Sequence, residues 1–208
     1  MIVKIPSAIS AHTGRRLSIR CPACGNRGTF EPIQTILDIA LPNLSLGQRK
    51  CPNLDCQAHI FCIYDNTGNV LRTYPAQRID FDPKSIPPKI VETFTEALSC
   101  DAENLHVASA IMIRRTLEEL CEDKGATGNT LKDRIGSLRS TVVLPEELFK
   151  ALDELRLLGN DAAHINAKTY DSIGPDEIEV AILLTKEILK AVYQLDDLLS
   201  RLIALKKP

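Results

Sequence analysis

Four cysteines arranged as two close pairs are the residues of this sequence best suited to chemistry. The first pair is Cys21-Pro-Ala-Cys24, followed by Gly25, and the second is Cys51-Pro-Asn-Leu-Asp-Cys56. Two thiolates from one tight turn can converge on a single ion, and proline and glycine favour such turns. A disulfide framework or four ordinary buried thiols are the alternatives, but this spacing without a secretory leader favours a metal. We therefore predict one structural Zn²⁺ held by Cys21, Cys24, Cys51 and Cys56.

Two further residues near the second pair are alternative ligands. His59 and Cys62 follow Cys56 closely and could replace it. Both lie in a run, residues 59–64, that reads as a strand entering a hairpin. Strand positions are the simpler interpretation of these two side chains.

A second candidate site is a polar cluster within an otherwise apolar helical pattern. Arg156 and Asn160 are four residues apart and share a helix face, and His164 continues that line if the helix continues past Gly159. A neutral imidazole can accept a proton from a ribose hydroxyl, and a guanidinium can stabilise charge on phosphorus. These candidate catalytic residues would suffice for metal-independent RNA cleavage.

The alternative for this cluster is a purely structural network. The helix is expected to bend, end or restart at Gly159, and in the structural interpretation Asn160 satisfies the backbone there and His164 bonds a carbonyl. Arg156 would pair with an acid of the preceding long helix, such as Glu118 or Glu119. The sequence leaves both interpretations open.

Adjacent arginines on that long helix are candidate binding residues. Arg114 and Arg115 cannot both face solvent, so one of them must point toward the helical interior or its mouth. A buried ion pair and an anion-binding site are the two interpretations.

Composition excludes several classes of protein. The chain has 208 residues, of which 44% are hydrophobic and 25% charged, so it can bury a core and is not disordered. Residues 1–82 carry nine Lys/Arg against six Asp/Glu, whereas residues 83–208 carry sixteen against twenty-one. The mildly basic first part is compatible with a phosphate-facing surface. Neither a signal peptide nor a membrane span is recognised, so we expect a cytoplasmic protein without a membrane partner.

The hydrophobic pattern changes once along the chain. Ile60–Tyr64 and Val70–Tyr74 flank the turn residues 65–69 and predict a hairpin, which together with the cysteines describes a zinc ribbon over residues 1–82. Prolines then recur at positions 75, 83, 87 and 88, where we place the boundary. The pattern of residues 83–208 is helical throughout. We predict an α+β protein with a small β zinc ribbon followed by an all-α antiparallel bundle.

Five helices are expected in the second part. They are a short one around Ile90–Leu98, a long one from about Glu103 to Asp123, a third capped by Thr130, a fourth opened by Pro145, and a last and longest one from Gly174. Proline at the first turn and neighbouring acids suit the start of the last helix.

Several motifs of the helical part resemble a known family. Arg114-Arg-Thr-Leu-Glu118, Cys121, Leu131-Lys-Asp-Arg-Ile135 with Leu138, and above all Leu155-Arg-Leu-Leu-Gly-Asn-Asp-Ala-Ala-His164 resemble the bacterial domain of unknown function 4145 family over residues 88–200. The resemblance implies a HEPN-like helical bundle, for which a preceding zinc ribbon is a common arrangement. Members occur alone or attached to restriction subunits of type I systems. Many HEPN-like bundles are RNases of toxin and phage-defence systems and dimerise.

The resemblance also bears on activity. His164 matches the histidine of the nuclease motif and Asn160 its polar residue, but Gly159 stands where the motif has arginine, and Arg156 lies a turn earlier. We therefore expect a non-catalytic binding or regulatory module of restriction or phage defence, with RNA, DNA or a defence protein as partner and a homodimer formed through the helices. The alternatives are a metal-independent ribonuclease and a protein–protein assembly module.

Overall fold

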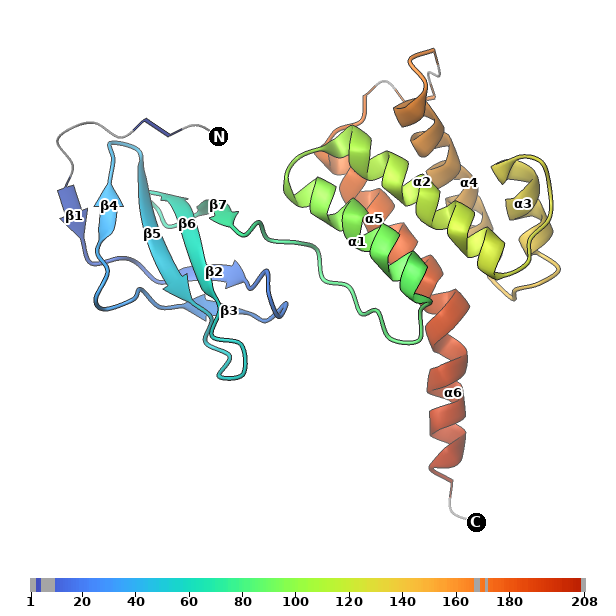
Figure 1. The fold of residues 1–208 in the computed structure, drawn as a ribbon, viewed down its shortest axis with the longest axis horizontal. Helices are drawn as coiled ribbons and strands as arrows, with labels where there is room; N and C mark the ends of the chain where they lie inside the picture. The colour runs from blue at the N-terminus through green and yellow to red at the C-terminus, as the bar shows by residue number, and fades with distance from the viewer. Residues whose placement is uncertain (1–2, 5–9, 167–168, 171, 207–208) are drawn as a thin grey trace. The chain divides into compact units, whose positions relative to one another are not determined.

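The protein consists of two compact units, a β unit at the amino terminus and a helical unit after it (Figure 1). The computed structural model describes residues 3–4, 10–166, 169–170 and 172–206. The chain divides between Met1–Asp80 and Phe81–Pro208. The predicted α+β class is confirmed, since antiparallel sheets form the first unit and helices the second.

Two antiparallel sheets build the first unit. One has five strands in the order β1-β4-β5-β6-β7, and the other is the hairpin of β2 and β3. The strands are β1 Ser10–His12, β2 Leu17–Arg20, β3 Arg27–Phe30, β4 Asp38–Ala40, β5 Leu44–Lys50, β6 His59–Asp65 and β7 Val70–Tyr74. Lys50 lies opposite His59 in the β5–β6 pair, so the second cysteine pair occupies the connection between these two strands.

The predicted hairpin is confirmed as the antiparallel pair of β6 and β7. Its turn is closed by Asp65, whose carboxylate accepts hydrogen bonds from the backbone N–H groups of Thr67 at 2.8 Å and Asn69 at 2.9 Å. Such an Asx turn is the local interaction that aspartate provides in short connections. The inner face of β6 contributes Ile60, Cys62 and Tyr64 to the core, where they pack with Leu17, Ile19 and Phe30.

A buried ion pair lies within the five-stranded sheet. Asp38 and Arg49 are both fully buried, and the guanidinium donates to the carboxylate at 2.7 and 3.1 Å. The hydroxyl of Tyr64 also donates to this carboxylate, at 2.5 Å. Gly47 makes room for the pair, because a Cβ there would lie 2.0 Å from a carboxylate oxygen. This network was not predicted from the sequence, although Arg49 follows Ser45 and Gly47 at the inward positions of β5.

The second unit is helical. Its elements are α1 Pro88–Ala102, α2 His106–Asp123, α3 Leu131–Leu138, α4 Glu146–Ala163, α5 Pro175–Leu189, the π-helical turn η1 Lys190–Gln194 and α6 Leu195–Ala204. The first two helices are antiparallel, since Lys89 at the start of α1 pairs with Glu122 near the end of α2 at 3.0 Å. Helix α2 packs against α1, α4 and α5 and is the central helix of the unit (Figure 1).

The helix starts follow the expected local chemistry. Thr130 caps α3 in a capping box, in which its hydroxyl accepts from the backbone N–H of Asp133 at 3.2 Å and its own N–H donates to the Asp133 carboxylate at 3.1 Å. Helix α5 begins with Pro175, and the N–H of Gly174 donates to Glu177 at 2.9 Å. Both starts were predicted from the sequence.

The last predicted helix is interrupted. A π-helical turn separates α5 from α6, and none of the residues of α6 is buried. Its exposed apolar side chains are Leu195, Leu198, Leu199, Leu202 and Ile203. Across the described residues, no helix combines the length and the apolar character needed to cross a membrane.

Candidate functional site

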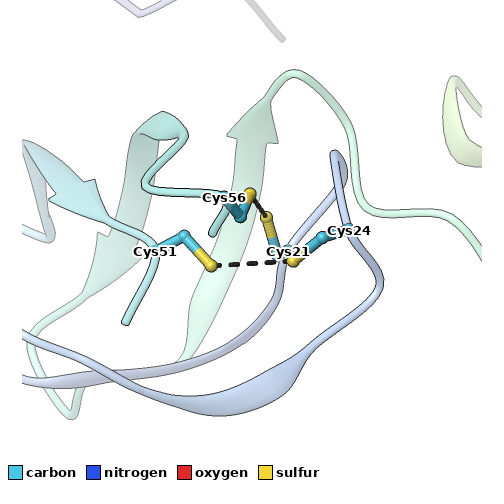
Figure 2. Close-up of side chains that lie close together, drawn as sticks. All are labelled: Cys21, Cys24, Cys51 and Cys56. Atoms are coloured by element: carbon cyan, nitrogen blue, oxygen red, sulfur yellow. Dashed lines mark hydrogen bonds between the residues drawn. The ribbon is translucent and has the colours of Figure 1, made fainter. Parts of the chain in front are cut away.

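The four predicted metal ligands lie together in the β unit (Figure 2). Their Sγ atoms are all within 4.8 Å of one another, with Cys21 3.8 Å from Cys56 and Cys24 3.7 Å from Cys51. A tetrahedral ion with metal–sulfur bonds of about 2.3 Å separates its ligands by about 3.8 Å, whereas a disulfide needs about 2.05 Å. All four cysteines are free thiols, so the disulfide interpretation is wrong.

Each cysteine pair sits in a turn of the same design. In the first turn the N–H of Gly25 donates to the carbonyl of Cys21 at 2.9 Å, and Gly25 has φ +73°. In the second turn the N–H of Gln57 donates to the carbonyl of Asn53 at 2.9 Å, and Gln57 has φ +48°. The residue after each second cysteine thus adopts the left-handed conformation that turns the chain back. A glycine adopts this conformation in the first turn, whereas a glutamine adopts it in the second.

Hydrogen-bond donors surround the sulfur atoms. The backbone N–H of Asn26 lowers the pKa of Cys24 to about 7, and the side-chain amide of Asn53 donates to Cys24 Sγ at 3.8 Å. Burial raises the pKa of Cys51 to about 12 despite a backbone N–H donor at Asn53. A buried thiol with such donors is suited to a bound divalent ion, which removes its proton.

The two alternative ligands lie elsewhere. His59 is exposed at the start of β6, and Cys62 is fully buried in the core, with its thiol directed to the carbonyl of Ile60 at 3.7 Å. Within the described residues, the cysteine cluster contains neither of them.

Helix α4 does not break at Gly159, contrary to the expectation from the sequence. The helix continues to Ala163, and Gly159 is buried against α2. A Cβ at this position would lie 2.4 Å from Arg114 Cβ and 3.2 Å from the carbonyl oxygen of Ala110. The glycine therefore allows the close approach of two helices and does not end one.

We expect Gly159→Ala to destabilise the helical unit by about 1–3 kcal/mol, because the added methyl overlaps a Cβ that cannot move without its backbone. Gly136→Ala is the matched control: Gly136 is exposed in α3 with nothing within 4 Å, so alanine should stabilise by about 0.5–1 kcal/mol. Urea unfolding of the two variants measures the difference. Similar changes in the free energy of unfolding of both variants would show that the close contact of Gly159 with α2 does not contribute to stability.

Arg156 pairs with Asp153, not with Glu118 or Glu119 as proposed for the structural network. Its Nε donates to Asp153 at 2.7 Å, one turn back along the same helix. The side chain is 16% exposed. The pairing acid lies on α4 itself because two residues three apart share a helix face.

The two glutamates of α2 pair instead with the adjacent arginines. Arg114 lies 3.2 Å from Glu118, and Arg115 lies 3.3 Å from Glu119. The Arg114 pair is partly exposed, whereas Glu119 is buried and Arg115 is 63% exposed. Each arginine therefore has an internal partner, and both line a cavity next to α2.

His164 caps the carboxyl end of α4. It is exposed, and its backbone N–H donates to the carbonyl of Asn160 at 3.0 Å. Eight residues of helix place its Cα about 12 Å from that of Arg156, whose guanidinium is held toward Asp153 in the opposite direction. The carboxylate of Asp161, three residues before His164, accepts from the backbone N–H of Tyr170 at 2.8 Å.

The structure thus defines a two-unit protein with a four-cysteine cluster in the β unit and a polar cluster at the end of α4. The sequence matches the model of the family described as "Domain of unknown function (DUF4145)" over residues 95–204, more than half of the chain. The protein belongs to this family, as its motifs predicted. Comparisons with curated proteins and with solved structures give no match. The cysteine cluster lies outside the matched residues.

Proposed function

We propose that this protein is a cytoplasmic, zinc-stabilised module that binds nucleic acid without cleaving it, in bacterial restriction or phage defence. The observation that carries the proposal is the convergence of four cysteine sulfurs within 4.8 Å. Four thiolates fill the coordination sphere of Zn²⁺ and leave no position for water or substrate, so the ion stabilises the fold. The resemblance of the helical motifs to HEPN-like bundles supports the defence setting.

The ligand set favours zinc as the ion. Thiolates are soft ligands and select Zn²⁺ or iron–sulfur chemistry among the common metals. Cys21, Cys24, Cys51 and Cys56 would hold the ion between two turns, and the hairpin of β6 and β7 lies next to them in sequence. This combination of two cysteine turns and antiparallel hairpins supports a zinc ribbon.

Two cations beside the cysteine turns are the proposed phosphate contacts. Arg27 follows the first turn and Lys50 precedes the second, and both are exposed. In the part of the chain that the structure describes, neither forms an ion pair, whereas the nearby Arg16 pairs with Glu31 at 2.8 Å. Cations without a protein partner are free to replace counterions on a phosphate backbone.

We expect the wild-type protein to bind short RNA or DNA at low salt in fluorescence anisotropy. Removing both cations, Arg27→Ala with Lys50→Ala, should weaken binding and reduce the slope of log affinity against log salt by about 2, since each phosphate contact contributes close to one. Arg16→Ala is the control, because that arginine is already paired. Absence of binding by both polymers to the wild type would contradict the nucleic-acid proposal.

The geometry at α4 favours binding over catalysis. A nuclease needs the base and the cationic group on one phosphate, and Arg156 is held by Asp153 away from His164. We expect wild type and His164→Ala to leave a labelled RNA equally intact. Cleavage by the wild type that disappears in His164→Ala would instead establish the ribonuclease alternative, with Asn160 as the positioning group.

The exposed face of α6 supports a second candidate role, assembly as a homodimer. Its leucines recur three and four residues apart, with Leu199 54% and Leu202 64% exposed. The helix is acidic at its start, with Asp196, and basic near its end, with Arg201. An antiparallel second copy would bury the leucines and pair these opposite charges.

We expect the protein to be a dimer in light scattering, and Leu199→Glu with Leu202→Glu to be a monomer with unchanged melting temperature, since both side chains are exposed. Ser200→Glu is the control on the same helix, because serine contributes no apolar surface. A monomeric wild type would contradict this role.

A further inference from the structure

A cavity of about 430 Å³ in the helical unit carries charges that the proposed function does not use. It lies along α2, with Lys89 of α1, Arg134 of α3 and Ala163 of α4 completing its wall. Its volume falls in the range of small-molecule sites, about 300–1,000 Å³. Four cationic and three carboxylate side chains line it, so its chemistry is that of a mixed-charge site.

Glu119 is the most unusual residue of this cavity. It is only 6% exposed, and the bond from Arg115 Nε at 3.3 Å reaches one of its carboxylate oxygens. The other oxygen, Oε2, is buried and has no hydrogen-bond partner among the described residues. A carboxylate accepts several hydrogen bonds, and burying one unsatisfied is costly. Glu119 lines the cavity, but Oε2 itself is sealed from solvent, so it becomes an acceptor for a ligand with N–H donors only when a neighbouring side chain moves.

Arg134 offers the complementary charge. Its Nε donates to the carbonyl of Gly128 at 3.3 Å, and it forms no ion pair within the described ranges. Two other cations of the cavity are already matched, Lys89 with Glu122 and Arg114 with Glu118. The guanidinium of Arg134 is thus left to receive an anionic group of a ligand, which it can bind by two parallel hydrogen bonds.

We propose that this cavity binds a small zwitterion of the α-amino-acid class, with its ammonium group on Glu119 Oε2 and its carboxylate on Arg134. The three donors of an ammonium group satisfy the buried acceptor. The cationic side chains disfavour a bare metal ion, and the buried carboxylate disfavours a purely anionic ligand. Arg115, whose side chain is 63% exposed, moves aside to admit the ammonium group. This proposal does not depend on nucleic-acid binding.

The test uses the full-length protein and the twenty proteinogenic amino acids at millimolar concentration, by thermal shift and then calorimetry. At least one amino acid should bind at one per chain and raise the melting temperature. Its N-acetyl derivative, which lacks the ammonium group, and its amide, which lacks the carboxylate, should each bind about 10- to 100-fold more weakly. If no amino acid binds, an ordered water satisfies Glu119 and the proposal is wrong.

Variants locate the site. Glu119→Gln and Arg134→Ala should each weaken binding about 10- to 100-fold. In addition, Glu119→Gln should leave the affinity for the N-acetyl derivative unchanged, because that probe lacks the ammonium group that Glu119 contacts. Glu147→Gln and Arg139→Ala are the controls, since both residues are exposed and lie outside the cavity. Binding that is equal in all four variants would place the ligand elsewhere and overturn the assignment.

Discussion

Removal of the metal should unfold the β unit while the helical unit stays folded. The first cysteine of each pair, Cys21 or Cys51, belongs to the hydrophobic core of this unit, so a bound ion would hold the core itself together. Structural zinc contributes about 10–16 kcal/mol of apparent binding free energy, which would here become folding free energy. Chelation, or the variant Cys51→Ser, should therefore abolish amide protection in residues 10–80 only, as measured by hydrogen exchange.

Metal analysis provides the direct measurement. We expect about one zinc per chain in purified wild type and much less in Cys51→Ser. Cys100→Ser is the control, because Cys100 lies on α1 in the helical unit, outside the cluster. A β unit that stays protected from exchange without metal would contradict the structural role. Stoichiometric iron in place of zinc would confirm a metal site but contradict the assignment of zinc.

Breaking the buried ion pair should have the next largest effect. Asp38→Ala leaves the guanidinium of Arg49 in the core without its carboxylate, and we expect a loss of about 3–5 kcal/mol in the free energy of unfolding. The exposed pair of Arg16 and Glu31 in the same unit is the control, for which Arg16→Ala should cost about 0–1 kcal/mol. Chemical unfolding of the metal-bound β unit measures both.

A double variant separates the charge effect from the cavity that it leaves. Replacing both partners, Asp38→Ala with Arg49→Met, removes the uncompensated charge and should recover part of the stability lost in Asp38→Ala. If Asp38→Ala costs no more than Arg16→Ala, the buried pair does not stabilise the sheet.

Local patterns in the sequence were sufficient for much of the molecule. The cysteine spacing identified all four members of the cluster, and the turn residues between Ile60–Tyr64 and Val70–Tyr74 identified the hairpin. Thr130 identified a helix start. Each cysteine turn, the hairpin turn and the helix cap depend on residues within a few positions of one another, so the sequence shows them directly.

One error arose where the role of a residue depends on a distant part of the chain. Glycine at position 159 looks like a helix break when only its neighbours are considered, yet its role is set by Arg114, across the packed surface of another helix. Arg156 shows the opposite error, because its partner was sought on α2 but lies three residues away on α4 itself. Propensity is a weak signal, and packing overrides it.

The sequence by itself determined the family, the α+β class and the four cysteines that converge in the β unit. Only the tertiary structure decided which charges are buried together. Asp38 pairs with Arg49 across a sheet, and Glu119 lines a cavity formed by residues of four helices. The physical reason is that burial and charge pairing depend on packing between elements, which no local pattern records.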